Sequence, residues 1–355
     1  MQNLLDLTRP ELVSWVQSEL GQPRFRADQL WQWLWQKMAD DFSAMTNISR
    51  ETRALLPEKA SIVKPRVVTK QVSSDDTVKF LLELADGARV ETVLIPSDSR
   101  EGARRWTQCL SSQVGCPMGC TFCATGSMGF TRNMTHGEIL GQVLVARAHL
   151  GDYRPDHPIL RNLVFMGMGE PLLNLDAVMA ALRTLNDAKG LAFSPRRITV
   201  STCGIEKGIA ELGESGLAYL AVSLHAPTQE LRAQIMPRAA RWPLDSLIAA
   251  LKAYPVKTRE RITFEYLLLG GVNDSISHAE KLARLVNEVN GKLNLIVYNP
   301  SSGNPYEAPS EERVLAFEQC LWKRHVTAIV RASKGQDIDA ACGQLAVRHE
   351  AEEGA

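Results

Sequence analysis

The segment WTQCLSSQVGCPMGCTFCATGSMGF, residues 106–130, contains four of the seven cysteines in this 355-residue chain. Cys116, Cys120 and Cys123 stand at C-x3-C-x2-C spacing, and Cys109 lies seven residues before Cys116. In iron–sulfur proteins, cysteine thiolates are the usual ligands of the cluster irons. Three thiolates from one loop can therefore hold three irons of a 4Fe-4S cube and leave the fourth iron open to a substrate.

A zinc site is the alternative for this loop. It would be closed by Cys109 or by a distant histidine such as His136. Structural zinc sites commonly combine two short ligand pairs, and the sequence lacks a second such pair. The spacing therefore favours an iron–sulfur cluster, and the role of Cys109 stays open.

Strand-like and helix-like segments alternate on the C-terminal side of the loop. This pattern predicts parallel strands joined by crossover helices, in an open doubly wound sheet or in a full or partial barrel. The predicted strands cover residues 107–112, 162–167, 197–202, 218–224, 261–269, 293–299 and 327–333. Helical periodicity marks residues 136–150, 175–187 and 277–289.

The N-terminal region has a different pattern. Residues 10–20 and 27–42 have apolar spacing near that of a helix, with Asp28 as a candidate cap. Residues 1–60 also hold four of the seven tryptophans, which we expect to form a small core. Asp-Gly between the apolar runs 78–84 and 88–96 predicts a β-hairpin.

Charge and hydrophobicity limit the possible partners and the cellular location of the protein. The chain has 40 basic and 40 acidic residues, so the overall positive charge typical of a nucleic-acid-binding protein is absent. We expect a cytoplasmic protein outside the membrane, because the sequence shows neither a secretory signal nor an apolar run of about 18 residues. Local basic groups remain, at Arg24, Arg26, Arg196, Arg197, Lys207, Arg232, Arg238, Arg241, Lys252, Lys257, Arg259 and Arg261.

Polar or glycine-rich segments follow several predicted strands. They are MGMGEP at 166–171, STCG at 201–204, SLHAP at 223–227 and YNP at 298–300. The carboxyl ends of parallel strands meet at one edge, where α/β proteins build their sites. We therefore expect these segments to converge with the cysteine loop.

CPMGCTFC, with Phe122 before the third cysteine, resembles the signature of the radical S-adenosylmethionine (radical SAM) superfamily. SSQVGCPMGCTFCATG, GMGEPLLN, VSTCG, SLHA, YNP and DIDAACGQLA together resemble the RlmN type of RNA adenine-C2 methyltransferase, from about residue 20 to about 345. The resemblance implies an α/β fold: a partial parallel (β/α) barrel of the radical SAM type over 104–345. It would be preceded by a helical accessory domain at 1–60 and a short β extension at 61–103, and followed by an acidic tail at 346–355.

The resemblance also implies the cofactors and their ligands. One 4Fe-4S cluster would be held by Cys116, Cys120 and Cys123, and its open iron would chelate S-adenosylmethionine. Two S-adenosylmethionine molecules would be used per turnover, one of them cleaved by an electron to a 5'-deoxyadenosyl radical. The positions matching the family's S-adenosylmethionine contacts are Gly169, Glu170, Ser201, Ser223, Leu224, His225 and Asn299.

Three further residues match catalytic positions of that family. Cys342 would carry the methyl group as S-methylcysteine, and its carbon would add to adenine C2. Cys109 would resolve the resulting RNA adduct through a transient disulfide with Cys342, and Glu91 would accept a proton. The resemblance thus assigns Cys109 a catalytic role and not a ligand role. Cys203 and Cys320 match no such position, and we interpret them as packing residues.

The implied substrates are 23S ribosomal RNA, at the peptidyl-transferase centre, and transfer RNA, at the adenine 3' of the anticodon. An electron donor such as flavodoxin or ferredoxin would be the protein partner of a monomeric enzyme. Candidates for the RNA face are Arg24, Phe25, Arg26 and the basic stretch Arg196–Arg261. Two alternatives remain: the sister activity at adenine C8, of the Cfr type, and a zinc-stabilised RNA-binding module without catalysis.

Overall fold

The computed structural model describes residues 1–98, 104–153, 158–256, 260–300 and 304–347. Most of the predicted acidic tail, residues 348–355, lies outside the described residues, as do Lys257 and Arg259 of the basic stretch. Within the described parts, no helix is both long and apolar enough to cross a membrane.

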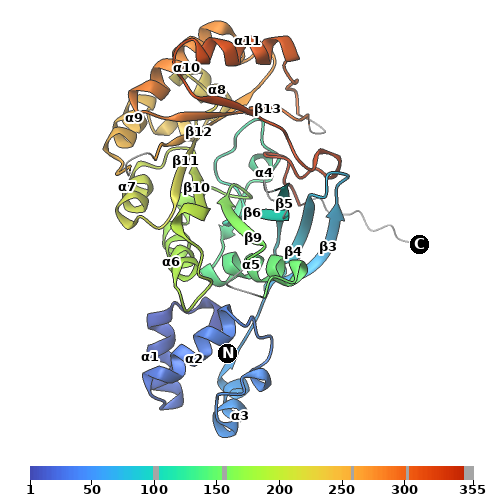
Figure 1. Cartoon of the computed structure of the whole chain (residues 1–355), viewed down its shortest axis with the longest axis vertical. Coiled ribbons are helices and arrows are strands. Elements are labelled where there is room, and N and C mark those ends of the chain that lie inside the picture. The colour runs from blue at the N-terminus through green and yellow to red at the C-terminus, as the bar shows by residue number, and fades with distance from the viewer. Residues whose placement is uncertain (99–103, 154–157, 257–259, 301–303, 348–355) are drawn as a thin grey trace, which may run out of the picture.

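A ten-stranded sheet forms the body of the molecule (Figure 1). Seven of its strands are joined by parallel pairing, in the order in which they follow along the chain. They are β6 (Arg104–Cys109), β9 (Leu160–Phe165), β10 (Ile198–Thr202), β11 (Tyr219–Ser223), β12 (Thr263–Leu268), β13 (Lys292–Val297) and β14 (Ala328–Arg331). In the described part of the chain β14 is an end of the sheet order, so the predicted partial barrel is confirmed.

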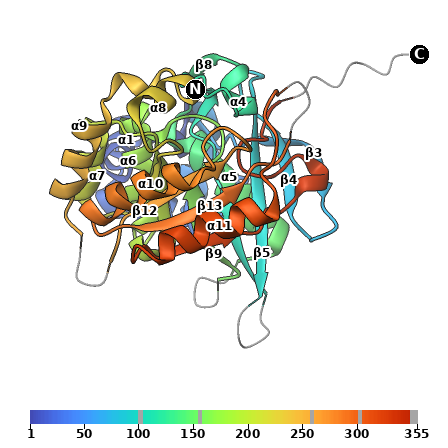
Figure 2. The same cartoon turned by 90° about the horizontal axis from the view of Figure 1, so that it is seen from above.

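Helices cover the outer face of this curved sheet, as the view from above shows (Figure 2). They are α5 (His136–Leu150), α6 (Leu175–Asn186), α7 (Glu206–Ser215), α9 (Leu244–Ala253), α10 (Ile276–Glu288) and α11 (Glu311–Trp322). The short helix α8 (Gln229–Ile235) lies against the cysteine loop, where the Ile235 carbonyl accepts from the Thr121 N–H at 3.0 Å. The start of α5 carries a capping box, because Thr135 accepts from the Glu138 backbone and Glu138 accepts in return. The bounds of α5, α6 and α10 confirm the predicted helices 136–150, 175–187 and 277–289 to within a residue.

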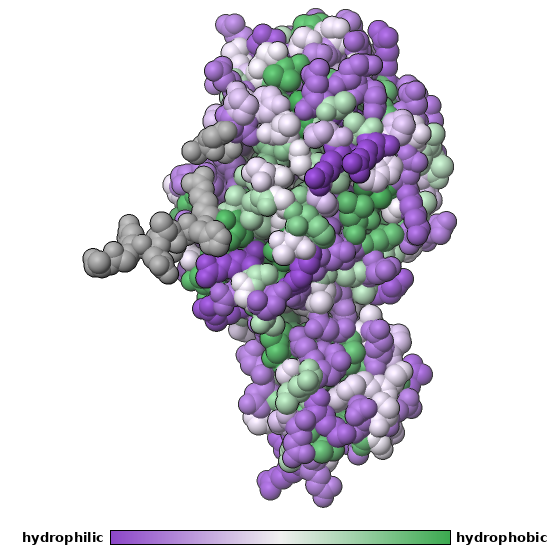
Figure 3. Space-filling view, turned by 180° about the vertical axis from the view of Figure 1, so that it is seen from behind, coloured by the Kyte–Doolittle hydropathy of each residue, from purple (hydrophilic) through white to green (hydrophobic). Residues whose placement is uncertain are grey.

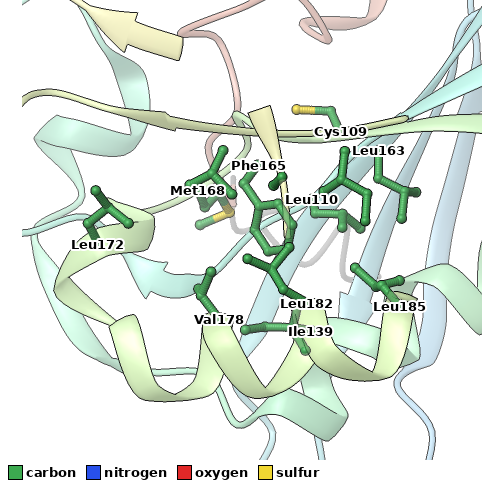
Figure 4. Close-up of a cluster of buried hydrophobic side chains, with 14 of the residues drawn as sticks. Cys109, Leu110, Ile139, Leu163, Phe165, Met168, Leu172, Val178, Leu182 and Leu185 are labelled. Atoms are coloured by element: carbon green, nitrogen blue, oxygen red, sulfur yellow. The ribbon is translucent and has the colours of Figure 1, made fainter. Parts of the chain in front are cut away.

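Apolar side chains from alternate strand positions fill the layer between sheet and helices. Figure 4 shows Leu163 and Phe165 of β9 packed toward Ile139 of α5 and Leu182 of α6. The sulfur of Cys109 points away from this cluster, toward the other face of the sheet. Because side chains alternate across a strand, β6 ends with a thiol in the barrel interior.

The predicted hairpin is confirmed, and it continues the barrel sheet. β4 (Val78–Glu83) and β5 (Arg89–Asp98) pair antiparallel, and β3 (Arg66–Val72) joins β4. β5 then pairs with β6, the first strand of the barrel. Residues in this hairpin are thereby placed beside the cysteine loop.

The N-terminal residues form a smaller lobe below the barrel (Figures 1 and 3). Its helices are α1 (Arg9–Leu20), α2 (Arg24–Trp35) and α3 (Arg50–Lys59), and β1 (Gln2–Asn3) pairs with β2 (Ala60–Ser61). Trp31 and Trp35 are buried edge to face, with ring centroids 5.6 Å apart. The prediction of Asp28 as a cap was wrong: it lies inside α2, where its carboxylate pairs with Arg9 at 2.6 Å.

Candidate active site

The cysteine loop follows β6 and is held by glycines. β7 (Gln113–Gly115) and β8 (Phe130–Asn133) pair across it, and the short helix α4 (Ala124–Ser127) begins right after Cys123. A Cβ atom at Gly126 would lie 2.8 Å from the carbonyl oxygen and 3.0 Å from the nitrogen of Cys120. The loop therefore wraps closely around its second cysteine, and only a residue without a side chain fits there.

The three cysteines of the loop form one electrostatic group. Burial raises the pKa of the Cys116 thiol to about 12, and Cys123 adds to that rise. Burial and the two neighbouring thiols also raise the pKa of Cys120. Thiols this withdrawn from water ionise only beside a compensating cation, and a bound metal deprotonates its thiol ligands.

These thiols fit an iron–sulfur cluster better than a single zinc ion. Among the described residues, no group of three or more His, Cys, Asp or Glu side chains converges so as to hold one metal ion. A four-iron cube gives each thiolate its own iron, so the sulfurs do not have to meet at one point. Cys116, Cys120 and Cys123 would hold it.

The segment after β9 carries Gly169 and Glu170 into the same region. Glu170 is buried, and its two carboxylate oxygens accept from the backbone N–H of Cys203 (2.8 Å) and of Leu172 (3.0 Å). Its own N–H donates to the Gln113 side chain at 2.8 Å. Gly169 has φ +101°, and a Cβ there would lie 2.6 Å from that of Gln113. This segment is therefore fastened to the cysteine loop and to the end of β10.

The ends of β10 and β11 lie side by side. Ser201 Oγ and Ser223 Oγ are 3.1 Å apart, and the next residue, Leu224, is fully buried. Asn299, after β13, donates to Ser333 Oγ at 2.7 Å, next to β14. The structure thus places these predicted contact residues at the carboxyl ends of the strands, on the edge that carries the cysteine loop.

His225 is a neutral imidazole held in a fixed orientation. Its Nδ1 accepts from the Leu267 backbone at 3.0 Å, and burial lowers its pKa to about 3. Its ring lies edge to face with Phe122, at 5.0 Å between centroids. Because Nδ1 accepts, the proton of the neutral ring is on Nε2. His225 therefore presents one donor beside the cysteine loop.

Cys109 and Cys342 line one cavity of about 1130 Å³ inside the barrel. Both are free thiols, Cys109 buried and Cys342 exposed to the cavity. Withdrawal from bulk water raises the pKa of both thiols, that of Cys342 to about 11, and Cys342 is a further cause for Cys109. Two cysteines that are 233 positions apart (342 minus 109) thus face the same space.

The C-terminal segment that carries Cys342 is fastened on two sides. The Gly343 carbonyl accepts from Ala124 at 2.8 Å, and the Leu345 carbonyl accepts from Thr125 Oγ1 at 2.5 Å. On the other side, Lys79 Nζ donates to the Asp339 carbonyl at 3.3 Å. Cys342 is therefore held between the hairpin and the helix that follows Cys123.

Glu91 lies in β5, where it forms a buried ion pair with Lys79. Lys79 Nζ is 3.2 Å from Glu91 Oε1, while Glu91 Oε2 is buried without a hydrogen-bond partner. Burial raises the pKa of Glu91, and Lys79 opposes that rise. The carboxylate thus has one occupied and one free oxygen.

Comparisons with known proteins agree with this site. Residues 2–62 match the family model of the ribosomal RNA large subunit methyltransferase N-terminal domain, and residues 110–286 match that of the radical SAM superfamily. A dual-specificity RNA methyltransferase RlmN from Nitratidesulfovibrio vulgaris is 74% identical over 345 residues, covering 97% of this chain and 94% of that relative. The chain belongs to the RlmN family. It is a radical SAM RNA methyltransferase, and the family implies a 4Fe-4S cluster and S-adenosylmethionine.

Other relatives extend this RlmN assignment. The dual-specificity RNA methyltransferase RlmN of Lawsonia intracellularis is 59% identical, covering 97% of this chain and 96% of that relative. The crystal structure of a radical SAM methyltransferase from Sphaerobacter thermophilus has a TM-score of 0.89 at 43% identity, covering 97% of this chain and 99% of that one. Membership in an enzyme family rules out the zinc-stabilised module without catalysis.

The structure corrects one candidate of the RNA face and supports two packing assignments. Arg232 is fully buried, and its guanidinium donates to the carbonyls of Ala239 (2.8 Å), Trp242 (2.6 Å) and Cys203. It therefore cannot touch RNA from the surface. Cys203 and Cys320 are both buried, as packing residues should be.

Sequence reasoning did not single out Lys79, Glu265 and Asn294, which lie beside these candidate residues. Glu265 and Asn294 line the same cavity as Cys342, from β12 and β13. A polar residue within an otherwise apolar strand, as in TFEYLL and KLNLIV, was the available signal. It identifies an inward-facing group, although it does not tell which chemistry the group serves.

Proposed function

We propose that this enzyme methylates C2 of adenine, in 23S ribosomal RNA and in transfer RNA at the adenine 3' of the anticodon. The observation that supports it best is the pair of free thiols, Cys109 and Cys342, facing one cavity beside a separate three-cysteine loop. Adenine C2 is not a nucleophile, so the methyl carbon must reach it by a route that a protein thiol can provide. Two S-adenosylmethionine molecules would be used per turnover.

Cys342 carries the carbon in this proposal. Its thiolate takes a methyl group, and its place in the cavity lets that carbon meet a base that has left its stack. When bound, the cluster and S-adenosylmethionine would supply the one-electron chemistry, which removes a hydrogen atom from the methyl group and takes up the unpaired electron left after the carbon has added to C2. The carbon then bonds to C2, which leaves RNA and protein covalently joined.

Glu91 and Cys109 release the product. Glu91 accepts the proton from C2, and it has a buried oxygen with no other partner. The Cys109 thiolate attacks the Cys342 sulfur, so that an S–S bond forms while the bond between that sulfur and the methylene carbon breaks. That carbon leaves with the electron pair and takes up a proton from water to become the methyl group of the product. An external reductant then restores both thiols.

We assign the cofactor-binding roles to the residues around the cysteine loop. Cys116, Cys120 and Cys123 hold the cluster, while Gly169, Glu170, Ser201, Ser223, Leu224, His225 and Asn299 surround S-adenosylmethionine. We assign RNA contact to the accessory domain at 1–60, the hairpin extension to 61–103 and the catalytic core to 104–345. The enzyme would act in the cytoplasm as a monomer, with flavodoxin or ferredoxin as electron donor.

The test compares three cysteine variants under anaerobic conditions, with labelled RNA lacking the modification. C342A should form neither product nor adduct. C109A should accumulate a covalent RNA–protein adduct that survives denaturing electrophoresis. C320A, which changes a buried cysteine of α11, should behave like the wild type. Adduct formation by C342A would overturn the proposal.

The position of methylation has its own readout. Mass spectrometry of digested wild-type product should show 2-methyladenosine. Detection of 8-methyladenosine would transfer the enzyme to the C8 activity of the Cfr type. That activity uses the same two cysteines, so the variants above do not separate the two positions.

A further inference from the structure

The cavity that holds Cys342 has one buried carboxylate on its wall. Glu265 lies in the middle of β12 and is 6% exposed. Its neighbours on the inward face, Thr263 on the same strand and Asn294 on β13, line the cavity as well. The strand therefore turns an acid toward the space where the substrate base must lie.

Glu265 is held in place by its partner strand. Residues 265 and 294 are paired in the register of β12 and β13, and Asn294 Nδ2 donates to Glu265 Oε1 at 2.8 Å. An ionised carboxylate offers about four acceptor positions. One hydrogen bond to Oε1 therefore leaves acceptor capacity directed at the cavity.

Two cations and a thiol lie near this carboxylate. Burial raises the pKa of Glu265, and the hydrogen bond from Asn294, together with Arg331 of β14 and Lys292 of β13, opposes that rise. The Cys342 thiol is near enough for Glu265 to raise its pKa, second only to burial. A carboxylate near the sulfur that delivers carbon to the base is also near the base itself.

The positions of C2 and the 6-amino group on adenine fit the positions of Cys342 and Glu265 on the cavity wall. C2 lies between N1 and N3, and N1 separates it from C6, which carries the amino group. A base whose C2 faces the carbon on Cys342 therefore turns its amino edge toward the neighbouring wall. Protein carboxylates accept hydrogen bonds from such exocyclic amino groups.

We propose that Glu265, oriented by Asn294, accepts a hydrogen bond from the 6-amino group of the target adenine and selects adenine at this site. The assignment rests on the proposed function, because it needs a base with C2 at Cys342. Glu265 is then a specificity-determining residue. Loss of its partner group on the base leaves a buried acceptor unpaired, which is costly.

The experiment uses one RNA made with adenosine, purine ribonucleoside or inosine at the target position. All three carry hydrogen at C2, and they differ at position 6, where they have an amino group, a hydrogen or an oxygen. The holoenzyme should show a kcat/KM at least about tenfold lower for purine ribonucleoside than for adenosine. Equal values in the wild type would overturn the inference.

E265M keeps the approximate volume and removes the acceptor. It should bring the ratio of kcat/KM for adenosine over purine ribonucleoside to within about threefold of one. If E265M loses activity equally on both RNAs and keeps the wild-type ratio, Glu265 is only structural and the inference fails. E214Q is the matched control, since Glu214 is an exposed acid on the same cavity, and its ratio should not move.

E265Q keeps the inference testable if E265M does not fold. Its carbonyl can accept from Asn294, which turns an amide N–H toward the base. That donor suits the oxygen of inosine, so the ratio for adenosine over inosine should fall; an unchanged ratio overturns the assignment. If the wild-type enzyme leaves C2 of the adenosine RNA unmethylated, the proposed function has failed. If it methylates the adenosine and purine-ribonucleoside RNAs with equal kcat/KM, only the inference about Glu265 is wrong.

Discussion

Lys79 and Glu91 form an ion pair across β4 and β5, with Lys79 Nζ 3.2 Å from Glu91 Oε1 and side chains only 9% and 6% exposed. In the strand register Leu81 lies opposite Glu91, so Lys79 reaches it diagonally. Lys79 also donates to the Asp339 carbonyl, three residues before Cys342. One side chain thus positions both the acid and the segment that carries Cys342.

We expect K79M to shift the pH dependence of methylation. Burial raises the pKa of Glu91 and Lys79 lowers it, so loss of the lysine should raise that pKa further. Glu91 can accept a proton only when ionised. The acid side of the profile of kcat/KM against pH should therefore move to higher pH.

K70M is the control for this profile. Lys70 is an exposed lysine on β3, the strand next to β4. Its removal changes the net charge of the enzyme by the same amount and should leave the profile in place. If K79M keeps the wild-type profile, Lys79 does not set the protonation of Glu91.

G126A should weaken retention of the iron–sulfur cluster. The added methyl group would meet the Cys120 backbone at 2.8 and 3.0 Å, so Cys120 must move. Iron and sulfide per protein, with the visible absorption of the cluster, measure the loss after reconstitution. S127A, at the next position of the same helix, removes only a hydroxyl and should retain iron like the wild type. Full iron content in G126A would contradict the steric argument.

R232M tests the buried arginine that sequence reasoning had placed on the RNA face. Its guanidinium donates to three carbonyl groups, and methionine leaves them without donors. We expect the free energy of unfolding to fall by about 3 kcal/mol or more, measured by urea denaturation. R241M removes an exposed arginine from the same stretch and should cost less than about 0.5 kcal/mol. A loss below about 1 kcal/mol in R232M would show that water replaces the donors.

The fold could be predicted from the sequence where the hydrophobic periodicity of a segment agreed with the turn residues at its ends. Strand and helix alternation placed the parallel strands, and β13 matches its predicted segment closely because KLNLIV is apolar and bounded by Gly291 and the YNP turn. The hairpin followed from Asp-Gly between two runs. Its continuation into the barrel sheet could not be predicted, since pairing of β5 with β6 depends on a register between distant segments.

Side-chain partners were harder to predict than elements. Asp28 has the residue type of a helix cap, but α2 begins earlier, at Arg24 after Pro23. The Asp28 carboxylate forms an ion pair with Arg9 instead. Arg232 resembles any surface arginine in sequence, and only the fold shows the three carbonyls that it satisfies. Lys79 gives no separate signal because it alternates with apolar residues as an exposed strand residue would. Each miss is a contact that a side chain makes outside its own helix or strand, which the local pattern does not encode.

Phe25 provides a prediction about the RNA face. Its side chain is 56% exposed on α2, and the Arg26 guanidinium carbon lies 5.2 Å from the ring centroid. An exposed aromatic ring beside an arginine is suited to stack on an unpaired base, which contributes about 1–3 kcal/mol. F25A should therefore weaken RNA binding about tenfold, measured as Kd at fixed salt. L315A removes a similarly exposed apolar side chain from α11, outside the accessory domain, and should leave Kd unchanged.

Salt dependence separates stacking from charge at the same surface. Arg24 is exposed beside Phe25. If it contacts one phosphate group, R24A should lower the slope of log Kd against log salt by about one. F25A should shift the whole line and keep its slope, because stacking releases no counterions. A wild-type Kd that does not respond to salt would remove basic side chains from the RNA interface altogether. The same titration with both variants thus tests whether the accessory domain binds RNA through charge, through a stacked base or through both.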